Sequence, residues 1–580
     1  MGQSDFGGFD PDQDRPQAVR TFCSPGERRC LAENSPLSER CGERGVSWER
    51  DTCDAGQICH NRQCIEFSCV PARAICVGTD ARATCSPNAR EVQNVVTCED
   101  DEICRAGACI DPCAEAAREG AYIGCDYVSQ RLFNLYQQRD TNASGNAHLS
   151  PFAIIAANPS RFHDARVTIT NEHGQAHELL TNLRLVPDPV YQRSESTTVS
   201  SAIMRAGEPL LELDGEARLV RIPPDSAAVL LLAPPSPNES GTYKITTTRP
   251  VVAYQFSPYC CNFTATNDAS LLLPTASMGT RYRVFSYPTM FFQESLGFAG
   301  LDPYFYVVAL EDETTIKVTD REPLTLASGD FDPVLLDSEI DQQGTSITFT
   351  ADALERRVFT RSGDLSGALV ESDKPVAVFV GHPCTFVPQE DWACDHLEEQ
   401  LLPATTLGKN YLLPTFRLRN EPLFQADRNR EGIYWRLVAE EDARVTLSPS
   451  LQELELYEPS TFQTQGCLTM ATDGVIAMQA GDVCELGLKG VASLSSTGAL
   501  AVAGVLSGHQ STGQDSYGTQ AGDPSLFTAP PVEQYRRDYT FVTPPTFKKT
   551  FASIVAPEGA PVSYRGELVP DSERLDRQLI

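Results

Sequence analysis

The stretch YFYVVALEDETTIKVT, from Tyr304 to Thr319, decides the fold of this chain. Two short apolar, β-branched runs surround an acidic turn, which is the pattern of two antiparallel strands joined as a hairpin. The same element returns as FAIIAANPSRFHDARVTIT from Phe152, IYWRLVAEEDARVTLS from Ile433 and FASIVAPEGAPVSYRG from Phe551. Recurrence of one strand pair predicts an all-β protein built from repeated units.

Two further elements follow the first in a fixed order. The second reads RLVRIPPDSAAVLLLA from Arg218, SITFTADALERRVFT from Ser346 and VIAMQAGDVCELGL from Val475. The third reads TTTRPVVAYQF from Thr246, ESDKPVAVFVG from Glu371 and SSTGALAVAGVLSG from Ser495. Three ordered elements predict tandem antiparallel β-sandwich modules at residues 150–265, 275–403 and 409–510, followed by a linker at 511–538. Because the fourth copy opens at Phe551, we expect residues 539–580 to form a truncated fourth β module.

The cysteines gather in front of these modules. Twelve of the chain's 20 cysteines fall in two blocks of six, residues 23–64 and 69–109, whose spacings differ only in the middle. Such blocks have little apolar core, so we predict two small disulfide-rich modules behind a disordered leader at 1–22. Residues 110–149 are expected to form a junction with a short helix. Zinc is the alternative, but the spacings lack paired CxxC motifs.

The amino-acid composition excludes several classes of binding partner. A formal net charge of −31 argues against nucleic acid and anionic membranes, which need clustered Lys and Arg. No apolar run is long enough for a transmembrane helix. Disulfides persist in oxidising compartments, so we expect an extracellular or cell-surface protein. The segment before Cys23 lacks a basic and an apolar region, so the export signal is expected to be absent from this sequence.

One polar cluster could carry chemistry: GHPCTFVPQEDWACDHLEEQ, from Gly381 to Gln400. Its first interpretation is a zinc site in which H-x-C and C-x-H supply ligands and Glu398 or Glu399 acts as general base. The second is a disulfide between Cys384 and Cys394 that closes a short loop. We favour the disulfide because an exported protein oxidises its cysteines and the H-E-x-x-H motif is absent.

The remaining cysteines offer further pairs. Cys467 and Cys484 flank one hairpin, and Cys113 could bridge to Cys125. The neighbours Cys260 and Cys261 are expected to find partners elsewhere, Cys113 and Cys125 among them, because adjacent cysteines bridge only through a strained ring. The sequence contains no nucleophile elbow, Walker loop or dinucleotide motif in usable context, so we predict no cofactor and no catalysis.

Two longer phrases carry a resemblance. RPVVAYQFSPYCCNFTATNDASLLLP, from Arg249, and KPVAVFVGHPCTFVPQEDWACDHLEEQLLP, from Lys374, resemble the IgGFc-binding protein N-terminal domain family of animal mucus proteins and secreted or surface-attached bacterial proteins. The likeness spans roughly residues 120–580 and leaves out the six-cysteine modules. It implies an extracellular, non-catalytic binding or adhesion protein, and it does not carry immunoglobulin binding to this chain. Within the phrases, Asn267, Asp268, His382 and His396 stand out, with turn capping and strand-end hydrogen bonding favoured over ligand contact.

Three hypotheses of function result. The leading one is a binding or adhesion protein whose ligand is a protein or glycan, with loops on rigid sheets as the contact surface. The second is a metal-dependent hydrolase around His382 and His396. The third is a self-associating envelope or matrix protein. The ligand-binding residues, the ligand and the oligomeric state stay open at this level.

Overall fold

A computed structural model shows a chain of β-sheets in two compact units, residues 1–115 and 116–580. Among the described residues there is a single α-helix, so the all-β prediction is confirmed. None of the helices in the described part is long and apolar enough to cross a membrane. The structure describes residues 26–30, 37–41, 48–53, 57–60, 63–66, 69–87, 92–99, 102–134, 152–180, 183–185, 197–199, 201–205, 211–212, 219–233, 235, 239–259, 268–291, 300–326, 339–341, 343–391, 395–416, 419, 431–512, 523–543, 552–557, 559–564 and 567–569.

The N-terminal unit consists of small sheets fastened by disulfides, as predicted. In both six-cysteine blocks the second cysteine pairs with the fifth and the fourth with the sixth. The described pairs are Cys30–Cys59, Cys53–Cys64, Cys69–Cys85, Cys76–Cys104 and Cys98–Cys109. Its strands are β1 (Arg28–Cys30), β2 (Leu37–Cys41), β3 (Trp48–Thr52), β4 (Gln57–His60), β5 (Gln63–Glu66), β6 (Ala74–Val77), β7 (Ala81–Cys85), β8 (Val92–Thr97), β9 (Ile103–Arg105) and β10 (Ala108–Ile110), followed by α1 (Pro112–Glu119). Two disulfide pairings, and one three-stranded and one two-stranded sheet, are thus common to the described parts of both blocks.

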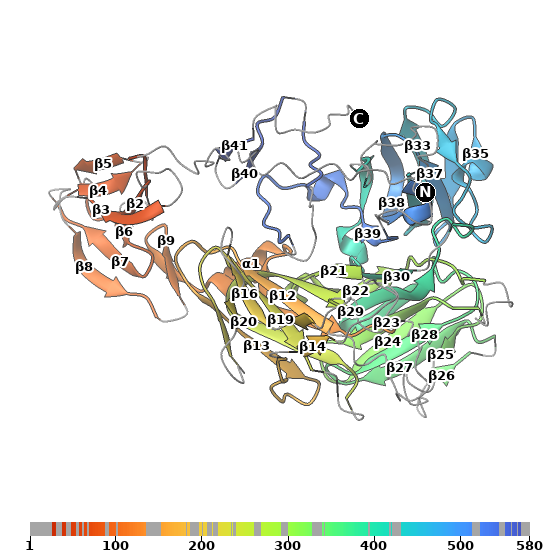
Figure 1. Ribbon diagram of the computed structural model, residues 1–580, viewed down its shortest axis with the longest axis horizontal. Coiled ribbons are helices and arrows are strands. Elements are labelled where there is room, and N and C mark those ends of the chain that lie inside the picture. The colour runs from red at the N-terminus through yellow and green to blue at the C-terminus, as the bar shows by residue number, and fades with distance from the viewer. Residues whose placement is uncertain are drawn as a thin grey trace, which may run out of the picture. The chain divides into compact units, whose positions relative to one another are not determined.

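The larger unit contains three nine-stranded sheets (Figure 1). We call them the first, second and third β units. The second and third have the same strand order, and the first has the same central order but differs at its edge strands. The first comprises β11 (Gly124–Gln130), β12 (Phe152–Asn158), β13 (Ala165–Asn171), β16 (Ala202–Arg205), β17 (Leu211–Glu212), β18 (Val220–Ile222), β19 (Ser226–Leu232), β20 (Thr242–Ser257) and β21 (Asp268–Leu272), with β14 (Leu183–Leu185) and β15 (Thr197–Val199) as a separate pair.

The second unit comprises β22 (Gly279–Arg283), β23 (Tyr304–Ala309), β24 (Thr314–Thr319), β25 (Thr325–Leu326), β26 (Glu339–Ile340), β27 (Ser346–Ala351), β28 (Arg356–Thr360), β29 (Leu369–Thr385) and β30 (Asp395–Gln400). The third comprises β31 (Gly408–Leu413), β32 (Ile433–Ala439), β33 (Ala443–Ser448), β34 (Leu456–Tyr457), β35 (Ala471–Thr472), β36 (Val475–Met478), β37 (Val483–Leu488), β38 (Ala492–Leu506) and β39 (Leu526–Thr528). Short 3-10 helices are η2 (Thr275–Ser277), η4 (Ala404–Thr406), η6 (Cys467–Met470), η7 (His509–Thr512) and η8 (Val532–Gln534), and a last pair is β40 (Ser563–Tyr564) with β41 (Glu567–Leu568). The module boundaries predicted above stay predictions.

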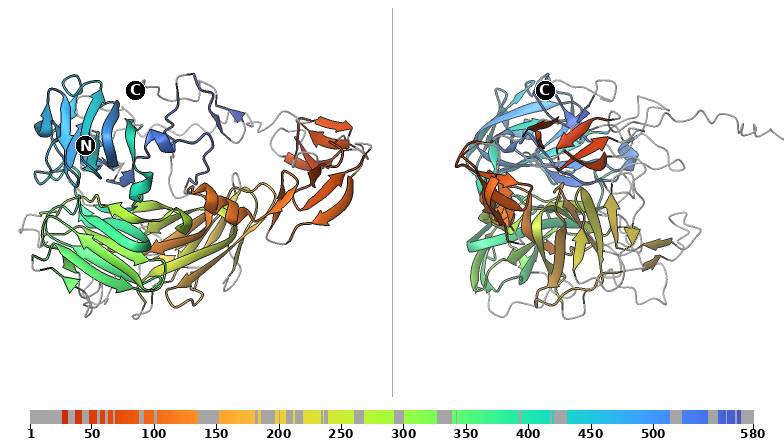
Figure 2. Two further views of the ribbon diagram at one scale, coloured as in Figure 1. Left: turned by 180° about the vertical axis from the view of Figure 1, so that it is seen from behind. Right: turned by 90° about the vertical axis from the view of Figure 1, so that its left-hand side faces the viewer.

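One long strand organises each unit. In the second unit, the first part of β29 pairs with β22 and β24, whereas its later part pairs with β23 and β30. β20 and β38 do the same in the first and third units. Each long strand therefore belongs to two layers of its unit (Figure 2). The side chains of both layers meet in one core.

The hairpins predicted from Phe152, Tyr304 and Ile433 are wrong, whereas Phe551, at the start of the fourth, lies outside the described residues. β23 and β24 both pair with β29, but along different segments, so the acidic turn carries the chain from one layer to the other. The physical reason lies in the two apolar patterns. All six residues of β23 are buried, whereas β24 alternates between buried and exposed positions, as a strand with one face in water does. The acidic residues between the two strands indicate that the chain reverses direction there. They do not indicate which strand each of the two pairs with.

β23 is buried on both faces because neighbouring units share their cores. Phe305 and Val307 point into the core of the second unit, whereas Tyr304 and Tyr306 pack with the core of the first. In the third unit, Tyr434 of β32 likewise joins the core of the second unit. The outer face of each later unit thus closes the core of the unit before it.

Candidate functional site

Three acidic residues from the two quoted phrases lie where strands of all three β units meet. Asp268 begins β21, and Glu398 and Glu399 lie in β30. β21 contacts β30, and β30 contacts β39. Asp268 and Glu398 are buried, and Glu399 is partly buried. We call these three residues the acidic cluster.

The carboxylate of Asp268 links the first unit to the other two. Its Oδ1 accepts a hydrogen bond from the hydroxyl of Ser525, at 2.8 Å. Its Oδ2 accepts the backbone N–H groups of Glu398 and Leu526, at 3.1 and 3.2 Å. One side chain therefore satisfies donors from the second unit and from the segment that begins β39.

Glu398 and Glu399 extend these links. The carboxyl group of Glu398 receives hydrogen bonds from the Gln255 amide and the Ser270 hydroxyl of the first unit, each at 3.4 Å. Glu399 Oε1 accepts the backbone N–H of Thr528 in the third unit, at 3.2 Å. The acidic cluster therefore fastens three units with hydrogen bonds from neutral groups.

Burial sets the protonation of the acidic cluster. Loss of hydration raises the pKa of Asp268 to about 7 and that of Glu399 to about 8, and it raises the pKa of Glu398 well above its usual range. Hydrogen bonds to Asp268 and Glu399 oppose this shift without cancelling it. The cluster thus holds protons near neutral pH, where exposed carboxyl groups are ionised.

The two histidines singled out in the sequence lie beside this cluster, fully buried. His396 Nδ1 lies 3.0 Å from the carbonyl oxygen of His382, and its Nε2 lies 3.8 Å from Glu398 Oε2. His382 Nδ1 accepts the backbone N–H of Cys384 at 3.2 Å. Burial lowers the pKa of both imidazoles to about 3, so both are neutral at physiological pH.

This arrangement gives the hydrolase hypothesis no support. A catalytic group has to reach a substrate, and both imidazoles lie at 0% exposure with their Nδ1 atoms against backbone groups. In the described ranges, the sole group of side chains spaced for a metal ion is Cys98, Glu102 and Cys109. There, Cys98 and Cys109 form a disulfide, so their thiolates are not available as ligands.

The cysteines proposed as pairs divide between described and undescribed positions. Cys467 and Cys484 form a disulfide with a Cα–Cα distance of 4.9 Å. Cys113, Cys125 and Cys384 are each disulfide-bonded. Cys260, Cys261 and Cys394 lie outside the described residues, as does Asn267, so the pairings proposed for these cysteines stay predictions.

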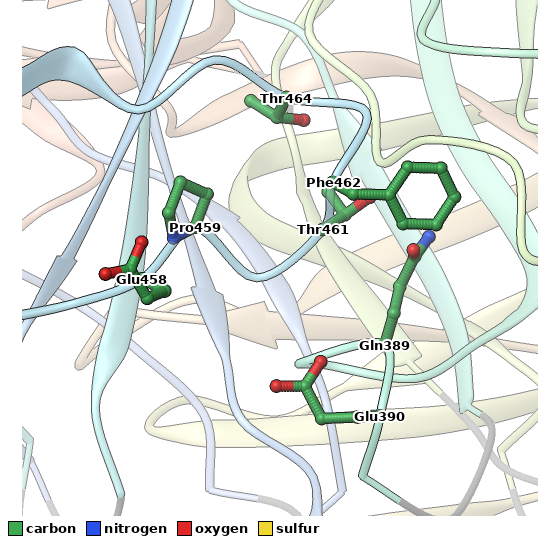
Figure 3. A pocket seen from close by; sticks show the side chains of 7 residues that line it. All are labelled: Gln389, Glu390, Glu458, Pro459, Thr461, Phe462 and Thr464. Atoms are coloured by element: carbon green, nitrogen blue, oxygen red, sulfur yellow. The ribbon is translucent and has the colours of Figure 1, made fainter. Parts of the chain in front are cut away.

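A surface hollow at the boundary of the second and third units is the candidate binding site, and sequence reasoning missed it. Its volume is about 330 Å³. Figure 3 shows the side chains that line it. Phe462 stands beside it with 81% of its surface exposed, and its ring lies 6.0 Å from that of Phe291, which is 53% exposed. The hollow is lined by Gln389, Glu390, Glu458, Pro459, Thr461, Phe462 and Thr464.

Hydrogen bonds between the two units fix the shape of this hollow. The Gln463 and Gln389 amides both donate to the carbonyl oxygen of Thr289, at 2.7 and 3.2 Å. The backbone N–H of Gln389 donates to the carbonyl oxygen of Ser460 at 2.8 Å. The loop that carries Phe462 is therefore held against the second unit before any ligand arrives, which lowers the entropy cost of binding.

The chemistry of the hollow suits a cationic group. Its two charged lining residues, Glu390 and Glu458, are acidic and exposed. Figure 3 shows the Glu390 carboxylate pointing toward the side on which Glu458 lies. A single arginine or lysine side chain could stack on the Phe462 ring and at the same time form an ion pair with one of these carboxylates. The one local signal in the sequence is a phenylalanine inside the polar run PSTFQTQ, which does not show that Phe291 lies beside it.

Comparisons with known proteins agree on one family. A family model described as IgGFc binding protein matches residues 268–573, a span that begins at Asp268 of the acidic cluster. The human protein named IgGFc-binding protein is 31% identical over 150 residues, which is 26% of this chain. The chain spans about 2% of the length of that relative. No solved structure matches the chain.

Proposed function

This chain belongs to the IgGFc-binding protein family, and on that premise we propose that it is a non-catalytic binding protein of the extracellular space or cell surface. We propose that its partner is another protein, because the human relative is named for binding a protein, the Fc fragment of immunoglobulin G. Disulfides in both six-cysteine blocks support an oxidising compartment. The single observation that carries a binding role is the exposed Phe462 beside a preformed acidic hollow.

The partner surface that fits this hollow is a basic segment. An exposed aromatic ring gives about 0.5 to 1 kcal/mol to a cation above its face, and more once water is excluded. Glu390 and Glu458 add charge attraction, which also speeds association with a basic partner. The chain's net charge of −31 acts in the same direction over longer distances. The fragment of immunoglobulin G known as Fc is one partner to test, because the human relative is named for it.

A glycan is the second candidate, because sugar rings also stack their C–H faces on aromatic side chains. The hollow offers Gln389, Thr461 and the two carboxylates as hydrogen-bond partners for hydroxyl groups. Glycan binding differs from the basic-segment proposal in one property. It responds little to salt, because a neutral sugar has no charge to screen.

Panning a random peptide display library on the whole chain tests the proposal. We expect enriched peptides to contain arginine or lysine next to an aromatic or small residue. Their affinity should fall at least about tenfold with Phe462→Ala and with the double change Glu390→Gln and Glu458→Gln, and it should fall again in about 0.5 M salt. The Fc fragment is assayed beside the peptides in the same format.

Leu468→Ala provides the matched control, because Leu468 is an apolar residue of the third unit that is also largely exposed and does not line the hollow. This variant should bind as the unchanged chain does. Peptides that bind equally well without the Phe462 ring would refute the site. Salt-insensitive retention of glycans that disappears with Phe462→Ala would replace the protein partner with a glycan.

A further inference from the structure

The junctions between successive β units repeat one small structure. Each begins with a proline in extended conformation, continues through a 3-10 helix and reaches a tyrosine eight residues after the proline. The three copies run from Pro274 through η2 to Tyr282, from Pro403 through η4 to Tyr411 and from Pro531 through η8 to Tyr539. In each copy the backbone N–H three residues before the tyrosine donates to its hydroxyl, at 2.9, 3.0 and 2.8 Å. The same bond joins Gly124 to Tyr127 at the start of the first unit, at 2.7 Å.

Each junction packs against the junction before it through a glycine and a proline. A Cβ atom added to Gly124 would lie 2.6 Å from the Cβ of Pro274, and one added to Gly279 would lie 2.7 Å from the Cβ of Pro403. Gly408 meets Pro531 still more closely. Contact therefore runs in one direction, from the glycine of each unit to the proline that opens the next.

The contact between the last junction and the first has charged residues in place of the glycine and the proline. Where the other copies have glycine, the fourth has Arg536. Five residues before Gly124, where the later junctions have proline, the chain has Glu119. Arg536 Nη2 lies 3.9 Å from Glu119 Oε2. An ion pair thus stands at the fourth contact, and it joins the last junction back to the first.

The sheet faces follow the same order. The outer faces of the second and third units close the cores of the units before them, as Tyr304 and Tyr434 show. The corresponding face of the first unit contains Ala153 and Ile155 of β12, which belong to a separate apolar cluster. Val542, three residues after the last junction tyrosine, packs against that cluster.

Direct contacts hold this returning segment on the first unit. The rings of Tyr122 and Tyr539 stack with centroids 6.4 Å apart. The backbone N–H of Thr540 donates to the Tyr122 hydroxyl at 2.7 Å, and that of Val542 bonds the Tyr254 hydroxyl. In Figure 1 the dark blue chain after β39 leads from the third unit back toward α1.

We propose that the outer face of the first β unit is the docking surface for a fourth β unit that begins at Pro531, so that the four units close into a ring. The occupant is this chain's own segment from Pro531 onward, because its contacts repeat the order of the three established junctions. Exposed apolar side chains in that segment, among them Phe541 and Ile554, make a second copy of the chain the rival occupant.

Hydrogen exchange of the whole chain, read at the Thr540 and Val542 amides, tests the docking. Both amides donate to tyrosines of the first unit, so they should be protected in the unchanged protein. Val542→Asp puts a charge into the apolar cluster and should speed exchange at Thr540 at least about tenfold. Phe541→Asp is the matched control, because Phe541 is a half-exposed neighbour, and it should leave Thr540 protected.

A second variant guards against misfolding. Tyr122→Phe removes only the hydroxyl that accepts the Thr540 N–H, and it should speed exchange there while β29 stays protected. Unprotected Thr540 and Val542 amides in the unchanged chain would overturn the proposal. So would a dimer in which mixed light and heavy copies cross-link Tyr122 of one chain to Tyr539 of the other, because the occupant would then be a second copy.

Discussion

Two buried polar sites join the β units by opposite means. In the acidic cluster, carboxyl groups receive hydrogen bonds from amides, hydroxyls and backbone N–H groups, and burial keeps them protonated. In what we call the arginine cluster, Arg436 of the third unit lies between Asp364 of the second unit and Glu485. The difference teaches that the partners of a carboxyl group matter as much as its burial. In the arginine cluster a guanidinium, which is always charged, lies against the two carboxyl groups, whereas the acidic cluster offers only neutral donors and burial raises the pKa of its carboxyl groups.

Removing the guanidinium should have the largest effect on stability. Arg436 is fully buried, and its Nη1 lies 3.0 Å from Glu485 Oε2 while its Nη2 contacts Asp364 Oδ2. Arg436→Met fills similar volume but leaves two carboxylates without their cation, so the free energy of unfolding should fall by about 3 to 5 kcal/mol. Chemical denaturation at neutral pH measures the change.

Arg444→Met is the control, since Arg444 lies on the exposed face of β33 in the same unit and should change stability by less than about 0.5 kcal/mol. Adding Asp364→Asn and Glu485→Gln to Arg436→Met should recover part of the loss, because no unpaired charge is then left. A loss below about 1 kcal/mol for Arg436→Met would show that water or other groups already screen this site.

The sequence predicted the fold class because its signals are local. The runs FAIIAAN, YFYVVA and IYWRLVA have the composition of strands, and their recurrence indicates repeated units. Strand pairing was not predictable in the same way. YFYVVA and TTIKVT sit on either side of a short acidic turn, yet β23 and β24 lie in different layers, where they pair with different segments of β29. The continuous apolar run YFYVVA is consistent with a strand buried on both faces, but no local pattern shows that the first unit covers its second face.

The candidate sites show the same limit. Asp268, His382 and His396 could be singled out from the quoted phrases, but the Ser525 hydroxyl that binds Asp268 lies 257 residues away in the chain. Burial of these groups, which sets their protonation, follows from the meeting of three units. Phe291 and Phe462 stack across a unit boundary, and neither belongs to a periodic pattern that would mark it.

A pH titration of stability should reveal the acidic cluster, where each carboxyl group has a smaller effect per pH unit than loss of Arg436. The folded-state pKa values of Asp268 and Glu399, about 7 and about 8, lie above the values of these groups in the unfolded chain, and that of Glu398 is raised further. The folded chain therefore keeps protons that the unfolded chain releases, and the free energy of unfolding should fall as pH rises from about 6.5 to 9. Above about pH 6.5, Asp268 and Glu399 together should account for a fall of about 2 to 3 kcal/mol that ends near their folded-state pKa values of about 7 and about 8, since each group contributes at most about 1.4 kcal/mol per pH unit. Glu398 should add up to the same slope across the whole window.

Other buried groups titrate outside this window. His382 and His396 have folded-state pKa values of about 3, so they remove stability only as pH falls below about 6.5. The buried tyrosines, such as Tyr243 with a pKa of about 12, act only above about pH 10. Denaturation curves at constant ionic strength would measure the slope, and a stability that is flat or rising between about pH 6.5 and 8 would contradict protonated carboxyl groups in the cluster.

Of the changes considered in the two clusters, Glu398→Gln should alter the free energy of unfolding least at about pH 6.5. It also gives the most direct comparison between the acidic cluster and the arginine cluster. If Glu398 is protonated when folded, the amide replaces a neutral group of similar size, and stability at about pH 6.5 should change by less than about 1 kcal/mol. The fall between about pH 7 and 9 should lessen by as much as one proton's share, about 1.4 kcal/mol per pH unit. Glu313→Gln, at an exposed position of the same unit, should leave the slope unchanged.

The opposite result has a definite meaning, because Glu398 Oε2 lies 3.8 Å from His396 Nε2. A proton moved from the carboxyl group to the imidazole would turn this contact into an ion pair like that of Arg436. Glu398→Gln would then leave a buried imidazolium without its anion and cost several kcal/mol even at about pH 6.5. We expect the neutral form, because burial raises the pKa of Glu398 and lowers that of His396. An arginine keeps its proton under the same burial because its pKa in water is about six units above that of histidine.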